Sequence, residues 1–374
     1  MFELQTIKFN TMKKSKLFLA AMLAGFSAIT VAQAQTARLE IIHNSPDPAA
    51  ETVDVYVDGL GLVVDDLQFR TTTGFITVPS GLTLQIGLAP STSNEAGGNG
   101  AGDIIATLTE GPLASGETYI AIANGFLNGT GFSPAPAFGL DIFAGAREAA
   151  VGGAGTNDVL VYHGSTDAPM VDVAELALLG GAVAVNDISY SEFQGYLPFG
   201  VENYLLQIQA AANSAAVAAF DAPLAALGVD GAALTVLASG FLDPSSNSNG
   251  PAFGLFVSTG AAGALLELPT AEARIEIIHN SADAAAAVVD VFVNGAEAVP
   301  NFAYRTSTGF ITLPAGMPLS IQVAPDGAGL GGALPAINIP FLASGETYIA
   351  IANGIVSGSG YSPAPAFALD IFAG

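Results

Sequence analysis

The sequence predicts an all-β protein of three tandem antiparallel β-sandwich domains, of immunoglobulin-like or transthyretin-like architecture, that follow a signal peptide. Three observations lead to this prediction. A unit of about a hundred residues occurs three times. Each unit holds short runs of β-branched and aromatic residues with turn signals between them. The N-terminus has the pattern of an export signal.

The repeat is clearest between the first and third copies. Residues 37–45 read ARLEIIHNS and residues 273–281 read ARIEIIHNS, while SGETYIAIANG at 115–125 recurs unchanged at 344–354. The middle copy has diverged but keeps DVLVYHGSTDAPMVDV at 158–173. We therefore expect repeat domains at 35–146, 157–260 and 272–374, with linkers at 146–156 and 259–272.

Each copy is expected to contain seven short strands. In the first copy they are predicted at 39–43, 53–57, 74–79, 82–88, 104–109, 118–123 and 138–143. Asp58-Gly59 ends the second run, and Asn294-Gly295 replaces it in the third copy; both pairs suit a tight hairpin turn. The alanine-rich stretch 209–227 is a candidate short helix. The tryptophan and paired cysteines of antibody domains are absent, so only the architecture is predicted.

Residues 1–34 are predicted to be a signal peptide whose start is Met12. Three lysines follow Met12 closely, Leu17 to Val31 is an uncharged apolar run, and Ala32-Gln33-Ala34 offers small residues for cleavage before Gln35. We expect a secreted protein, periplasmic or at the cell surface. No later run of 18 uncharged apolar residues occurs, so membrane insertion after cleavage is not expected.

The charge balance restricts the partners. Removal of the first 34 residues takes away all four lysines and one acid, which leaves 32 acidic residues against five arginines and a net charge of −27. Such a surface repels nucleic acid and anionic membranes. The chain has no cysteine, which excludes disulfides, thiolate metal sites and a cysteine nucleophile.

One histidine stands at the same place in each copy, at His43, His163 and His279. In each copy it is followed at fixed spacing by a serine and an aspartate (Asp47, Asp167, Asp283), and a second aspartate follows further on (Asp54, Asp172, Asp290). A hydrolytic Ser/His/Asp site is one interpretation, but such sites normally combine distant segments. We favour capping of the turn by the side-chain oxygens, with the histidine ring bonded to the backbone. No catalytic residue is therefore assigned.

Four of the five mature arginines also recur in pairs. Arg38 and Arg70 in the first copy match Arg274 and Arg305 in the third. An ion pair or a carbonyl contact is the favoured role, and a site for an acidic sugar or carboxylate is the alternative. The candidate ligand-binding set is His43, Asp47, Asp54, Arg70, His279, Asp283, Asp290 and Arg305.

Calcium is the one cofactor that the acidic loops suggest. Asp47, Asp54, Asp58, Asp65 and Asp66 offer some of the six to eight oxygens that calcium needs, although no EF-hand pattern is present. A solvated acidic face is the favoured interpretation, and calcium binding in copies one and three is the alternative. We assign no metal site.

The opening of each copy resembles a known family. Arg38, His43 and the Ser45-Pro46-Asp47 run, followed by VDVYVDG at 53–59, resemble the start of the bacterial domain-of-unknown-function family 4397, and 74–81 resembles its middle. The resemblance covers nearly all of the mature chain. It implies a secreted or surface-attached β-domain, often in tandem, and brings no established activity. The middle copy departs from the pattern, because Asp158 stands where Arg38 does.

Together these observations favour an exported, non-enzymatic repeat protein that acts in surface structure or adhesion. A surface protein or a polysaccharide is the expected partner. A carbohydrate-binding module array is the first alternative, although tryptophan is absent and only nine tyrosines occur. A secreted hydrolase is the second.

Overall fold

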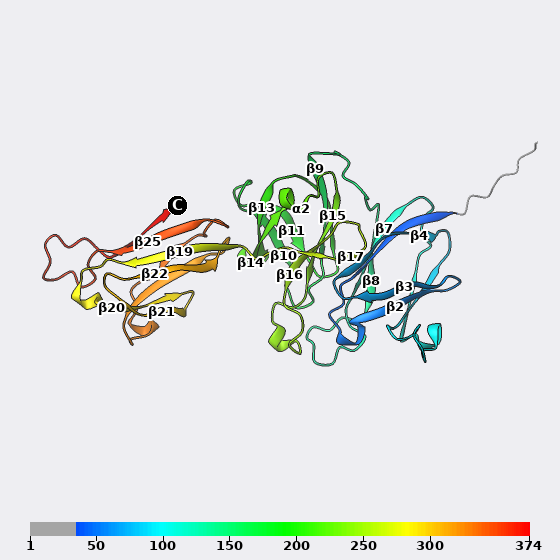
Figure 1. The fold of residues 1–374 in the computed structure, drawn as a ribbon, viewed down its shortest axis with the longest axis horizontal. Helices are drawn as coiled ribbons and strands as arrows, with labels where there is room; N and C mark the ends of the chain where they lie inside the picture. The colour runs from blue at the N-terminus through cyan, green and yellow to red at the C-terminus, as the bar shows by residue number, and fades with distance from the viewer. Residues whose placement is uncertain (1–34) are drawn as a thin grey trace, which may run out of the picture.

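The computed structural model describes residues 35–374, so the predicted signal peptide lies outside the described residues. Three β-rich domains follow one another along the chain and form an elongated row, with the first domain in blue, the second in green and the third in yellow to red (Figure 1). Each domain consists of two stacked β-sheets, as predicted. Within 35–374 no helix is long and apolar enough to cross a membrane.

Domain 1 contains eight strands of its own. Its first sheet has the order β17-β4-β1-β7-β8, and its second sheet has the order β3-β2-β5-β6. The strands are β1 (Thr36–His43), β2 (Thr52–Val57), β3 (Gly61–Gln68), β4 (Thr71–Pro79), β5 (Leu84–Pro90), β6 (Ala106–Glu110), β7 (Thr118–Asn124) and β8 (Gly139–Ala144). The ninth, β17 (Gly263–Ala264), comes from the segment that leads to domain 3. Most pairs are antiparallel, but β1 and β7 are parallel.

Domain 2 repeats this arrangement, with sheets β12-β9-β15-β16-β18 and β11-β10-β13-β14. Its strands are β9 (Thr156–His163), β10 (Val171–Glu175), β11 (Ala182–Ile188), β12 (Phe193–Gly200), β13 (Asn203–Ala210), β14 (Ala215–Pro223), β15 (Ala233–Ser239), β16 (Gly254–Ser258) and β18 (Leu266–Glu267). The parallel pair is β9 with β15. The one short α-helix in the described part of the chain is α2 (Leu224–Leu227).

Domain 3 has sheets β22-β19-β25-β26 and β21-β20-β23-β24. Its strands are β19 (Glu272–His279), β20 (Val288–Val293), β21 (Ala296–Ala303), β22 (Ser307–Pro314), β23 (Leu319–Pro325), β24 (Ile337–Ile339), β25 (Thr347–Asn353) and β26 (Ala368–Ala373). Short 3-10 turns complete the fold: η1 (Pro48–Ala50), η2 (Gly100–Asp103), η3 (Pro244–Ser246), η4 (Ala284–Ala286) and η5 (Leu330–Gly332).

The core of each domain lies between its two sheets. In domain 1, Leu39 and Ile41 of β1 face Val53 and Val55 of β2, because alternate residues of a strand point to the same side. The tight hairpin turn predicted at Asn294-Gly295 in domain 3 is confirmed. Asn294 and Gly295 join β20 to β21, and both adopt positive φ, 51° and 82°, as a tight hairpin turn requires.

Three expectations about local structure were wrong. Domain 1 has eight strands rather than seven, because β3 was missed. Residues 215–223, expected as part of a helix, form β14 and pair with β13 over eight positions, since one face of this alanine-rich strand packs in the core. Residues 259–272, expected as a linker, contain β17 and β18, whose backbone groups pair with β4 and β16.

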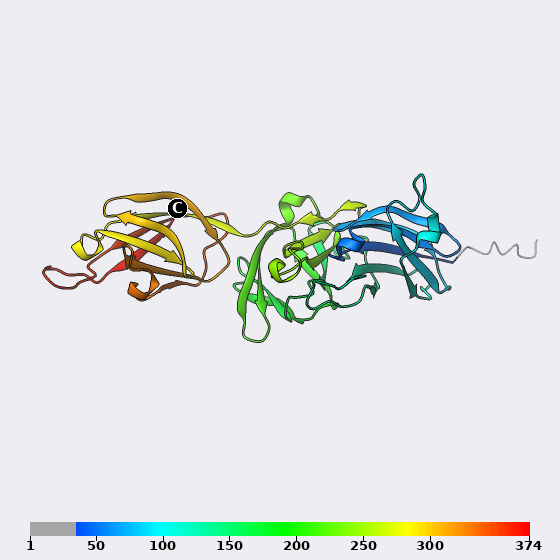
Figure 2. The same ribbon diagram turned by 90° about the horizontal axis from the view of Figure 1, so that it is seen from below.

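The two junctions between domains differ. Domains 1 and 2 pack the outer faces of their first sheets against each other, and a separate apolar cluster fills the space between them. Domain 3 meets domain 2 end-on, where Ala315 joins Leu205 and Ala219 in one cluster. Gln207 of domain 2 also donates a hydrogen bond to the Gly316 carbonyl. Figure 2 shows domains 1 and 2 side by side, whereas domain 3 follows a single connecting segment.

Candidate functional site

The histidine of domain 1 closes the turn between β1 and β2. His43 is buried and its Nε2 lies 2.6 Å from the Ala50 carbonyl oxygen. Ser45 donates its hydroxyl to the Gly125 carbonyl at 2.6 Å, so that hydroxyl bonds to the backbone rather than to the imidazole. Burial lowers the pKa of His43, which keeps the ring neutral.

The following aspartate caps the 3-10 turn. Asp47 accepts hydrogen bonds from the backbone N–H of Ala49 at 2.9 Å and of Asn128 at 2.8 Å. In domain 3, Asp283 accepts from Ala285 in the same way, and backbone N–H groups hold its pKa at about 2. His279 bonds to the Ala286 carbonyl at 2.8 Å. These contacts confirm the capping role predicted for the aspartate and the backbone bond predicted for the histidine ring, whereas the serine hydroxyl donates to a carbonyl beyond the end of β7.

The second aspartate has a different structural task. Asp54 accepts from the Asp66 N–H at 3.1 Å, and Asp290 accepts from the Asn301 N–H at 2.9 Å. Asp66 and Asn301 have positive φ, 53° in both, at a bulge in the neighbouring strand. Since Val53 and Val55 point into the core beside His43, Asp54 lies on the opposite face of β2. The structure therefore does not bring the histidine and this aspartate together.

Three carboxylates of the calcium candidates do meet. Oxygens of Asp54, Asp65 and Asp66 lie within 4.8 Å of one another, and Asn94 donates to Asp65 at 2.7 Å. Asp54 is already engaged by the Ser93 hydroxyl at 2.5 Å. Asp47 lies in its own turn, so the set falls short of the six to eight oxygens that calcium prefers.

Domain 3 cannot repeat that cluster. The register of β21 on β20 places Pro300 and Asn301 where domain 1 has Asp65 and Asp66. Asp290 is then the one carboxylate left at this position. Of domains 1 and 3, only domain 1 therefore holds this cluster of three carboxylates.

Arg70 and its counterpart Arg305 have different surroundings. Arg70 reaches into domain 2, where its Nε donates to Ser239 at 3.0 Å and its guanidinium donates to the Ala252 carbonyl at 2.8 Å. The same group lies 3.9 Å from the centre of the Phe256 ring, and burial lowers its pKa to about 10. Arg305, its counterpart in domain 3, is exposed and lies over Tyr304 at 5.0 Å.

Arg38 takes part in an ion pair, as expected, and its partner is Glu148. Arg38 pairs with Glu148 at 2.8 Å, and Arg147 pairs with Asp158 at 2.8 Å. Both pairs lie at the segment that joins domains 1 and 2. Glu40, which shares a sequence motif with Arg38, is buried between the domains instead.

Glu40 and Tyr162 provide the polar contacts of that interface. Glu40 accepts from the Thr72 hydroxyl at 2.7 Å and from the Ser258 hydroxyl of domain 2, and burial raises its pKa. The Tyr162 hydroxyl donates to Asp141 at 2.5 Å and accepts from the Asn124 amide at 2.9 Å. Burial raises the pKa of this tyrosine as well.

Apolar side chains surround these polar groups. We call the outer face of the β4-β1-β7-β8 sheet the docking face; its apolar residues are Ile42, Phe75, Ile120, Ile122 and Phe143. Domain 2 covers it with Leu160, Tyr162, Phe193, Tyr196, Leu237 and Phe256. Sequence reasoning missed this face. The signal was the unbroken apolar run of β7, which is typical of a strand buried on both sides.

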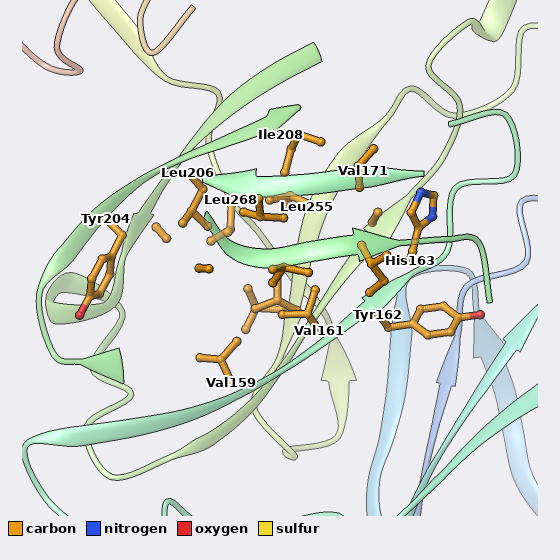
Figure 3. Close-up of a pocket in the computed structure, with 18 of the residues that line it drawn as sticks. Val159, Val161, Tyr162, His163, Val171, Tyr204, Leu206, Ile208, Leu255 and Leu268 are labelled. Atoms are coloured by element: carbon orange, nitrogen blue, oxygen red, sulfur yellow. The ribbon is translucent and has the colours of Figure 1, made fainter. Parts of the chain in front are cut away.

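Three cavities in the described part of the chain lie inside the sandwiches, one in each domain. Domain 2 holds one of about 80 Å³, whose walls include Val159 and Val161 of β9. Figure 3 shows these valines pointing into the cavity while the Tyr162 ring points away from it, toward the blue ribbons of domain 1. Domain 3 holds a cavity of about 160 Å³ at the place where domain 1 has one of about 20 Å³.

No protein-family model matches the sequence, and the search of curated proteins returned no match. Among solved structures, the chain is similar to the Bacillus anthracis TIE protein with a TM-score of 0.19 and 10% identity. The alignment covers 86% of this chain and 50% of that one, so the chain spans about half the length of the structure it matches.

Proposed function

We propose that this chain is an exported, non-enzymatic repeat protein of a bacterial cell envelope or exterior, and that it acts in surface structure or adhesion. The resemblance of its repeats to family 4397, the signal-peptide pattern and the acidic mature surface all favour this proposal.

The observation that carries it is the way the polar residues are used. The histidine, serine and first aspartate of domains 1 and 3 bind backbone groups of their own domain, and Arg70, Glu40 and Tyr162 bind across the interface of domains 1 and 2. These side chains fix the shape of the molecule rather than face a shared cleft. A fixed arrangement of domains suits a structural or adhesive role, because adhesion requires a surface to be presented rather than a reaction to be completed.

The test is a binding assay with purified residues 35–374. The protein is applied to whole bacterial cells and to a panel of polysaccharides, with calcium and with chelator. Saturable retention on cells without selective binding to any polysaccharide supports the proposal. Selective binding to one polysaccharide would favour a carbohydrate-binding array instead, and retention on neither would contradict the adhesive role.

A matched variant separates calcium effects from folding effects. Asp65→Asn with Asp66→Asn removes two of the three clustered carboxylates of domain 1 at nearly constant volume. If calcium acts through this cluster, the double variant loses the calcium dependence of binding while the chelator response of the wild type stays. An unchanged calcium response in the variant places the cation elsewhere.

A further inference from the structure

Domain 3 repeats the docking face of domain 1 residue for residue. The strand registers match Ile42, Ile120 and Ile122 with Ile278, Ile349 and Ile351. Phe75 and Phe143 likewise correspond to the two phenylalanines Phe310 and Phe372. The polar residues recur too, with Glu276 for Glu40, Asn353 for Asn124 and Asp370 for Asp141.

This second docking face is uncovered. Ile120 is 1% exposed, whereas its counterpart Ile349 is 38% exposed. Phe310 and Phe372 are 44% and 56% exposed. Two large aromatic side chains on one sheet face, beside an exposed isoleucine, form the kind of apolar surface that marks an interaction site.

Equivalent sheets of domains 1 and 2 face each other, so equivalent residues of the two domains meet at their interface. Asn44 and Gly164 occupy equivalent positions after β1 and β9, and the Asn44 amide donates to the Gly164 carbonyl at 3.2 Å. Phe126 and Phe241 are also equivalent and stack with ring centres 6.2 Å apart. Contacts between equivalent positions are the mark of a two-fold relation. The docking face is thus built to pair with another copy of itself.

Two reciprocal contacts define the rest of that two-fold relation. Arg70 of domain 1 and Ser191 of domain 2 are equivalent, since each has positive φ and donates its N–H to the carbonyl of its domain's histidine. Asp141 and Phe256 are equivalent by strand register. Arg70 contacts Phe256, and Ser191 donates to Asp141 at 2.5 Å.

In domain 3 these two positions carry opposite charges. Arg305 stands where Arg70 and Ser191 stand, and Asp370 stands where Phe256 and Asp141 stand. Two domain 3 faces paired in the geometry of domains 1 and 2 therefore place each Arg305 opposite the Asp370 of the other chain. The pairing forms two symmetric ion pairs around an apolar centre.

We propose that domain 3 is a self-association surface, through which two copies of this chain form a symmetric dimer by pairing their β22-β19-β25-β26 sheets face to face. A second copy is the occupant because the charges are self-complementary and because the matching face of domain 2 is already buried against domain 1. This inference does not depend on the proposed adhesive role.

The first test is the oligomeric state of purified residues 35–374. Sedimentation velocity is measured from about 1 μM to about 100 μM, a range in which modest interfaces dissociate. A concentration-dependent dimer is expected. A chain that stays monomeric throughout this range overturns the proposal, including the case in which it binds a different protein partner.

A charge exchange then tests the geometry. Asp370→Arg and Arg305→Asp should each weaken self-association by at least about tenfold, because each sets like charges against one another. An equimolar mixture of the two variants should restore dimers, since every facing pair is then opposite in charge. Both positions are exposed, so folding is expected to survive, which circular dichroism checks. Dimers unaffected by either single variant, or a mixture that stays monomeric, would refute this arrangement.

Discussion

Domains 1 and 3 present the same docking face in two environments. Ile42, Ile120 and Ile122 are buried beneath domain 2, while their counterparts Ile278, Ile349 and Ile351 in domain 3 are partly exposed. Arg70 is bonded to Ser239 and stacked on Phe256, whereas Arg305 touches only its neighbour Tyr304 among the aromatic rings. The burial of these docking-face residues therefore depends on whether a neighbouring domain covers the sheet, and not on the residues themselves.

Truncation of the central isoleucine is expected to destabilise domain 1 far more than domain 3. Ile120→Ala should lower the free energy of unfolding of the domain 1–domain 2 unit by about 2 to 5 kcal/mol, because it removes a buried side chain and leaves a cavity. Ile349→Ala, its matched control, should lower the stability of domain 3 by less than about 1 kcal/mol, since that residue is already 38% exposed to solvent. Urea unfolding at low protein concentration measures both. Equal losses would mean that the two faces do not differ as described.

The next effect is a dependence on pH. The folded state raises the pKa of Glu40 above the usual 4.5, so the folded state binds a proton more tightly than the unfolded state does. The resulting stability is fully present below pH 4.5 and is lost as the pH rises through the raised value. Glu40→Gln should abolish this loss of stability with rising pH. The glutamine side-chain oxygen can still accept hydrogen bonds from the hydroxyls of Thr72 and Ser258.

The measurement is urea unfolding of wild type and Glu40→Gln between pH 4 and pH 8, compared as a difference so that other titrating groups cancel. Glu276→Gln in domain 3 is the control, because Glu276 has no domain over it. His43 acts in the opposite sense, because its lowered pKa makes stability fall as the pH drops below 6.5. A Glu40→Gln difference that is flat with pH would contradict the buried environment of this carboxyl.

A smaller effect is expected from the difference in core packing between domains 1 and 3. Val323 of β23 lines the cavity of about 160 Å³ in domain 3, at the register position of Leu88 in domain 1. Val323→Leu adds one methylene and should raise the stability of domain 3 by about 1 kcal/mol. Hydrogen exchange of the β20 and β23 backbone amides measures this change in stability within domain 3. The reverse change, Leu88→Val, should cost domain 1 a similar amount; a destabilised Val323→Leu would mean that the cavity cannot accept the added group.

Much of the fold could be predicted from the sequence. The repeats, the all-β class, most strand positions and the Asn294-Gly295 turn follow from patterns within a few residues of one another. The capping role of His43 and Asp47 was also predicted, because side-chain capping acts over a few residues.

The remaining features depend on contacts that a local pattern does not encode. β3 was missed because Asp65 and Asp66 interrupt its alternation, and only the fold shows that Asp54 holds the bulge there. The alanines of β14 favour a helix when isolated, yet pairing with β13 fixes them as a strand. The docking face escaped prediction because residues that are identical in domains 1 and 3 are buried in one and exposed in the other.

The addition of β17 to β4 gives the chain an order of assembly. Domain 1's own strands end at Ala144, but the strand that closes the β4 edge of its sheet ends at Ala264. At roughly 5 to 20 residues per second, a growing polypeptide needs roughly 6 to 24 s to cover that interval. Throughout it, domain 1 has an open sheet edge and a bare docking face. The nascent protein therefore passes through a stage in which an unpaired strand edge and an apolar face are both open to other chains, and arrival of the segment after domain 2 ends that stage.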